Sequence, residues 1–169
     1  MTTPLNKSSM SDAHNETGSL SFSRALVYAT VLAGALDATD GVVFFGLHGL
    51  NPIQVLQYIT SGLLGAQSFR GGLATAGLGV LVHFSIALVV AAIYLLASRR
   101  IPALRTQWLM LSLLYGAAVW AVMNLAILPL SAVAPGHITT VALLNGVIGH
   151  AIFVGLPIAF FAKKVEGAV

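Results

Sequence analysis

Six polar side chains lie within stretches of the sequence that are otherwise strongly apolar. They are two acids, two imidazoles and two amides: Asp37, Asp40, His83, Asn124, Asn145 and His150. A carboxylate at the centre of a membrane helix costs roughly 2.5–3.5 kcal/mol on insertion scales, so it is kept where it faces other protein groups or a polar cavity. Acids and imidazoles can bind a cation, relay protons or ligate a metal. These six residues are therefore the candidates for function.

Helical spacing turns the acids and the first histidine towards neighbouring helices. Asp37 and Asp40 are three residues apart, so both can face the same neighbour. Gly34 shares the helical stripe of Asp37, and Gly79 shares that of His83. Small residues let helix backbones approach closely in lipid, so we expect these two stripes to pack inward.

The depths of the candidates also agree. With a rise of about 1.5 Å per residue, Asp37, His83 and His150 fall within one layer near the middle of the membrane. Asn124 and Asn145 fall nearer the outer surface. We therefore expect the six residues to share one polar interior. The expected ion- or proton-binding residues are Asp37, Asp40, His83 and His150, with Asn124 and Asn145 as supporting polar groups.

The composition requires that lipid surround most of this chain. Of 169 residues, 57% are hydrophobic and 8% are charged, against roughly 25% charged in soluble domains. Four apolar segments are each long enough to cross hydrocarbon as helices, and they lack the alternation of barrel strands. We predict an all-α integral membrane four-helix bundle. Its spans are expected at about 25–48, 73–97, 108–133 and 138–162, within a helical domain of residues 24–164.

Two segments outside the spans have their own character. Residues 1–23 are polar and lack apolar periodicity, which predicts a disordered tail. Asn51 and Pro52 are typical of a helix N-terminus, and they predict a short helix over 52–65. Its apolar face (Ile53, Leu56, Ile59 and Leu63) lies opposite a polar face (Gln54, Gln57 and Ser61). We expect this helix to lie flat at the outer interface with its apolar face in the acyl region.

The basic residues predict the orientation in the membrane. The net charge is +3, and seven of the eight basic residues fall on the side of the two termini. Those seven are Lys7, Arg24, Arg99, Arg100, Arg105, Lys163 and Lys164, and only Arg70 falls on the other side. Cytoplasmic loops carry the excess of Lys and Arg, so both termini are expected in the cytoplasm.

A cleaved signal peptide is the alternative for the first span, because small residues surround Ala35–Ala38. Apolar character resumes from Val42 to Leu47, and the preceding polar stretch is long for a signal peptide. A complete first helix is the preferred interpretation.

Several short motifs resemble the YagU-like family of uncharacterised bacterial inner-membrane proteins. They are His83-Phe84-Ser85-Ile86-Ala87 to Tyr94, Arg99-Arg100-Ile101-Pro102, Gly116-Ala117, Leu128-Pro129-Leu130, and Asn145 to Gly149-His150 with Phe153. The resemblance covers about residues 72–164 and implies a helical bundle in a bacterial inner membrane. The first span matches poorly, so the resemblance assigns no role to Asp37 or Asp40.

Three classes of function remain open. The first is a small transport or ion-binding bundle that uses the intramembrane acids and histidines. The second is a non-catalytic scaffold or accessory subunit, in which polar groups only fix helix pairing. The third is a cofactor protein in which His83 and His150 ligate haem, or bind a divalent metal with Asp37.

Other activities have no support in the sequence. It contains no Gly-rich phosphate loop, no His-Glu-x-x-His helix and no nucleophile elbow, so an enzyme is not expected. No cofactor is predicted, and the absence of cysteine excludes thiolate metal sites. Nucleic acid is not an expected partner, because no basic stripe alternates with aromatics. The expected partners are the lipid bilayer and either a second copy or another membrane subunit.

Overall fold

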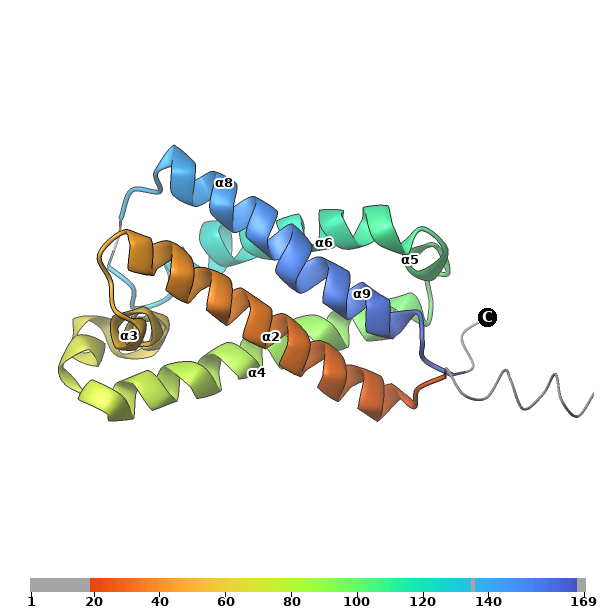
Figure 1. Cartoon of the computed structure of the whole chain (residues 1–169), viewed down its shortest axis with the longest axis horizontal. Coiled ribbons are helices and arrows are strands. Elements are labelled where there is room, and N and C mark those ends of the chain that lie inside the picture. The colour runs from red at the N-terminus through yellow and green to blue at the C-terminus, as the bar shows by residue number, and fades with distance from the viewer. Residues whose placement is uncertain (1–18, 135, 167–169) are drawn as a thin grey trace, which may run out of the picture.

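The protein is a bundle of four long helical spans in a computed structural model that describes residues 19–134 and 136–166 (Figure 1). The spans are α2 (Phe22–Leu47), α4 (Gly72–Ser98), the third span Trp108–Leu130 and the fourth span Thr140–Ala162. All four are long and apolar enough to cross a membrane, and the predicted all-α four-helix membrane bundle is confirmed. Of the predicted tail, residues 1–18 lie outside the described residues, and Phe22 already begins α2.

The third and fourth spans each contain a π-helical segment before a proline. The third consists of α6 (Trp108–Val122), η3 (Met123–Ile127) and α7 (Leu128–Leu130); the fourth consists of α8 (Thr140–Gly149), η4 (His150–Gly155) and α9 (Leu156–Ala162). Pro129 and Pro157 each follow the π-helical segment by two residues. Proline has no N–H to donate to the carbonyl four residues earlier, so the preceding turn widens.

The connection between the third and fourth spans is longer than the sequence predicted. We expected helices to residue 133 and from residue 138, but they end at Leu130 and begin at Thr140. Thr139 caps the fourth span, because its side chain accepts a hydrogen bond from the Ala142 N–H at 3.2 Å. The Ala132 N–H donates to the Gly62 carbonyl at 3.0 Å, which ties the connection to α3 (Pro52–Leu64).

Helix α3 begins as predicted, but its polar face is not in water. Asn51 and Gln54 form a reciprocal capping box, with Pro52 in the first turn. The Gln57 amide donates to the Gly72 carbonyl at 3.0 Å and the Thr60 hydroxyl to the Thr75 carbonyl at 2.6 Å. The polar face of α3 is therefore buried against the start of α4, because this contact satisfies polar groups that lipid would leave unpaired. The 3₁₀ helix η2 (Gly65–Arg70) makes the turn between them.

Small residues make up much of the core in the half of the bundle nearest the termini. Alanines of α2 pack against α4 and α9 in the core of this half. Nine of its side chains are at most 1% exposed, and Val154 and Val165 are 7% and 8% exposed. The nine are Ala25, Ala29, Ala33, Ala91, Tyr94, Leu95, Ile158, Ala159 and Ala162. We call this half the alanine half; α3 lies at the opposite end of the bundle (Figure 1).

Backbone hydrogen bonds join the two chain ends at the alanine half. The Leu20 N–H donates to the Lys164 carbonyl at 2.7 Å, and the Glu166 N–H donates to the Leu20 carbonyl at 2.9 Å. The described basic residues other than Arg70 also lie at this end, including Arg105 of the short helix α5 (Ala103–Thr106). Lys163 Nζ lies 3.7 Å from the centre of the Trp108 ring, a cation–π contact.

The outward faces of the spans are apolar. Large exposed side chains cover each span, among them Val31, Leu81, Leu125 and Leu144. A continuous apolar surface of this kind is not stable in water, so lipid is the solvent that it fits.

Candidate functional site

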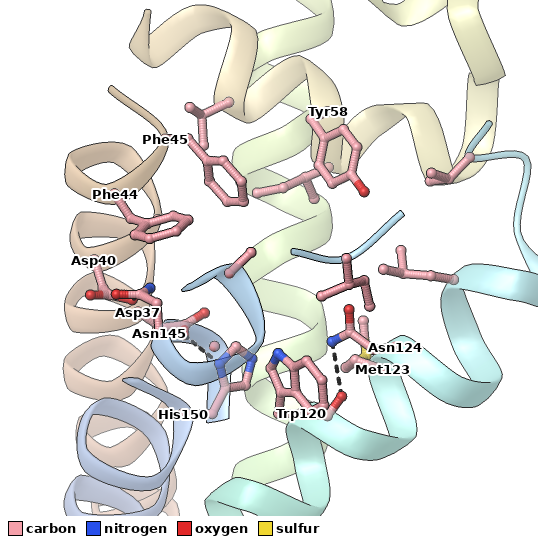
Figure 2. Close-up of a pocket in the computed structure, with 18 of the residues that line it drawn as sticks. Asp37, Asp40, Phe44, Phe45, Tyr58, Trp120, Met123, Asn124, Asn145 and His150 are labelled. Carbon is pink, nitrogen blue, oxygen red and sulfur yellow. Dashed lines mark hydrogen bonds and ion pairs between the residues drawn. The ribbon is translucent and has the colours of Figure 1, made fainter. Parts of the chain in front are cut away.

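A cavity of about 620 Å³ lies in the half of the bundle opposite the alanine half (Figure 2). Side chains from all four spans, from α3 and from the connection that precedes α8 line it. All six polar candidates are among them: Asp37, Asp40, His83, Asn124, Asn145 and His150. The shared polar interior that the sequence predicted is therefore present as a single cavity.

Two pairs join α2 to the fourth span at the floor of this cavity. Asp37 Oδ1 lies 3.4 Å from His150 Nδ1, and both side chains are about one-fifth exposed (19% and 23%). The Asn145 amide donates to Asp40 Oδ2 at 3.0 Å. Figure 2 shows the two carboxylates side by side on α2, facing Asn145 and His150. The three-residue spacing of the acids on one helical face explains why a single neighbour contacts both.

Glycines allow this close approach. A Cβ on Gly149 would lie 2.7 Å from Asp40 Oδ2, and a Cβ on Gly146 would overlap the Trp120 indole nitrogen. Gly149, one turn after Asn145, thus leaves room for Asp40, and Gly146 leaves room for Trp120 of the third span. The contact between Asp40 and Asn145 therefore depends on Gly149 as well as on the two polar side chains.

Gly149→Ala is expected to push the Asp40 carboxylate away from Asn145 and to lower stability by about 1–3 kcal/mol, the usual cost of overpacking. Thermal unfolding in detergent measures this loss. Gly41→Ala on α2 is the matched control, because its Cβ would meet nothing within 4 Å; there the better helix propensity of alanine should be neutral or stabilising. Combining Gly149→Ala with Asp40→Ala should recover part of the loss. An unchanged loss in that combination would show that Asp40 is not the group displaced.

His83 and Asn124 line the cavity without joining the two pairs. His83 Nε2 lies 2.8 Å from the Gly34 carbonyl of α2, and the Asn124 amide donates to the Trp120 carbonyl of its own helix at 3.0 Å. Sequence depth suggested one layer of Asp37, His83 and His150, but only His150 pairs with Asp37. His83 instead joins α4 to the backbone of α2.

No family model, curated protein or solved structure matches this chain. The resemblance to YagU-like proteins therefore stays a prediction. The function has to be argued from the cavity itself.

The metal interpretation requires more ligands in one place than the acids and imidazoles provide. Within residues 19–134 and 136–166, no three His, Asp or Glu side chains converge as metal ligands. His150 pairs with Asp37, while His83 contacts a carbonyl through Nε2. Haem or metal binding at these histidines stays an untested alternative.

Aromatic side chains form the part of the site that the sequence reasoning missed. Phe44, Phe45, Tyr58 and Trp120 all line the cavity. Phe44 follows Asp40 by four residues, so helical periodicity alone could have placed its ring over the acids. His137, to which the sequence assigned no role, also lines the cavity.

Proposed function

We propose that this membrane protein binds a cation or a proton at Asp37 and Asp40, as a small transport or ion-binding bundle. The observation that supports this function is the placement of both acids on the floor of one open cavity. A scaffold would also pair these groups, as Asp37 pairs with His150 and Asp40 with Asn145, but it would not need an open cavity beside the pairs.

The hydrogen bonds leave part of each carboxylate available to a ligand. In the described part of the chain, one oxygen of Asp37 faces His150 and one oxygen of Asp40 accepts from Asn145. Asp37 Oδ2 and Asp40 Oδ1 have no such partner there. Among the described residues, no Lys or Arg side chain lines the cavity. A cavity with two acids and no fixed Lys or Arg favours cations, because charge in a weakly polar interior is only weakly screened.

We expect that Asp37→Asn combined with Asp40→Asn abolishes cation-dependent stabilisation. A ligand at a hundredfold excess over its Kd stabilises the folded state by about 2.7 kcal/mol. Thermal unfolding of the protein in nanodiscs, measured across pH and with added Na⁺ or K⁺, detects this effect. The near-isosteric asparagines preserve the shape of the floor.

Glu166→Gln is the control for the loss of an acidic group, because Glu166 lies at the opposite end of the bundle beside Ser19. It should respond to cations and pH as the unmodified chain does. A folded double asparagine variant with the unchanged response would instead favour the scaffold function.

We also propose a bacterial inner membrane as the location, with both termini in the cytoplasm. The concentration of basic residues at the end that carries the termini supports this orientation. The cavity would then open towards the opposite, non-cytoplasmic side. Catalysis is not part of the proposal.

A further inference from the structure

The cavity has two chemically different regions. Its floor is formed by Asp37, Asp40, Asn145 and His150 with the Trp120 ring beside them, whereas Phe44, Phe45 and Tyr58 line the part nearer α3. Figure 2 shows the Phe44 ring directly beyond Asp40, with Phe45 and Tyr58 farther from the acids. The ring centres of Phe45 and Tyr58 are 6.5 Å apart. A ligand in this cavity would therefore meet acids at one end and aromatic faces at the other.

This division distinguishes between classes of cation. A bare inorganic ion needs several oxygen ligands to replace its water, for example six to eight for calcium, and among its rings the aromatic region offers only the Tyr58 hydroxyl. A hydrated ion would lose water against Phe44 and Phe45 without compensation. A cation that carries hydrocarbon groups gains from both regions, because its charge faces the acids while its groups pack on the rings.

The size and the opening of the cavity agree with a ligand larger than an ion. Its volume of about 620 Å³ falls within the range of roughly 300–1,000 Å³ typical of small-molecule sites. Three lining side chains are exposed as well, Phe45 by 37%, Tyr58 by 41% and Ile138 by 50%. The cavity thus reaches the surface near α3.

We propose that the ligand of this cavity is a lipophilic organic cation, with its charge at Asp37 and Asp40 and its hydrocarbon groups against Phe44, Phe45 and Tyr58. This inference rests on the proposed function, because it names the class of cation that the two acids bind. The ligand enters at the α3 end, where the rings are exposed.

Tetraphenylphosphonium is the probe, because its charge does not change with pH. Binding is measured by isothermal titration calorimetry on the full chain in nanodiscs, with empty nanodiscs as the blank. We expect saturable binding of tetraphenylphosphonium and none of tetraphenylborate, which has the same shape and the opposite charge. Asp37→Asn with Asp40→Asn should weaken binding by about tenfold or more, equivalent to about 1.4 kcal/mol.

Phe44→Leu tests the aromatic region, because it keeps an apolar side chain and removes the π-system. We expect about fivefold weaker binding, the loss of one cation–π contact of about 1 kcal/mol. Phe69→Leu is its matched control, since Phe69 is an exposed aromatic residue of η2 outside the cavity lining. Its binding should be unchanged.

The outcomes separate this inference from the function on which it rests. Equal binding of both probes, or equal binding by Phe44→Leu and Phe69→Leu, would overturn the inference. If tetraphenylphosphonium does not bind while pH- or Na⁺-dependent stabilisation still requires Asp37 and Asp40, the ligand class is wrong and the proposed function stands. If the protein neither binds tetraphenylphosphonium nor shows stabilisation that requires Asp37 and Asp40, both the inference and the proposed function are wrong.

Discussion

Gly116→Ala and Gly155→Ala are each expected to destabilise the bundle by about 2 kcal/mol or more, because either new methyl group would meet backbone. A Cβ on Gly116 would overlap the His150 carbonyl and the Ala151 Cα, and a Cβ on Gly155 would overlap the Ser112 carbonyl. Backbone atoms cannot rotate away as a side-chain tip can. The third and fourth spans would have to separate, and His150 would move away from Asp37.

Unfolding in a denaturing detergent, followed by circular dichroism, measures this loss for each variant. Gly77→Ala is the matched control, because Gly77 lies in the helical span α4 and its Cβ would meet nothing within 4 Å. It should be neutral or stabilising. The two damaging substitutions act on one helix crossing, so the double variant should lose less than the sum of the single losses. Stability like that of Gly77→Ala in either single variant would contradict the close crossing.

Single cysteines at the two ends of the bundle are expected to react from opposite sides of the membrane. The chain contains no cysteine, and Gln67 near α3 and Thr106 near the basic end are both exposed. In intact spheroplasts, a membrane-impermeant maleimide should label Gln67→Cys fully and leave Thr106→Cys unlabelled. We expect this pattern because an excess of basic residues, as at the Thr106 end, is typical of cytoplasmic loops.

Permeabilised cells are the control, because there both cysteines should react equally. The unmodified chain gives the background. The reversed pattern would place the termini outside, and equal labelling of both cysteines in intact spheroplasts would contradict an odd number of spans between the two positions.

Composition and spacing were enough to predict the elements of this fold. The four apolar stretches became the four spans, because lipid leaves a helix as the only way to pair their backbone groups. Asn51 and Pro52 predicted the start of α3, because a helix cap and a proline in the first turn depend on no distant contact. Such signals are strong because their causes lie within a few residues of the sequence.

Partners across the bundle were predicted less well. The helical rise predicted the depth of Asp37 in the membrane, but its partner depends on how the helices are rotated about their axes. In the structure Asp37 pairs with His150, and His83 contacts the Gly34 carbonyl. Pro129 and Pro157 lie just past π-helical turns, and these turns change the facing of every residue beyond them. A regular 3.6-residue period cannot account for that change.

The contacts of the polar face of α3 were not predicted, for a similar reason. Amphipathic spacing shows that Gln57 and Ser61 share a face, but it cannot show whether water or protein meets that face. The carbonyls of Gly72 and Thr75 meet it here, which only the folded chain could show. The aromatic lining was missed because Phe44 resembles any other apolar residue of a membrane helix.

The backbone hydrogen bonds of Leu20 connect the segment before α2 to the segment after the fourth span. These bonds hold Leu20 to Lys164 and Glu166, and the alanines of α2 in this half are buried, so we expect the spans to separate more easily at the α3 end. If the proposed ligand binds at Asp37, it would exchange through the α3 end of the bundle in the arrangement described here. Transport to the other side of the membrane would then require the alanine half to open.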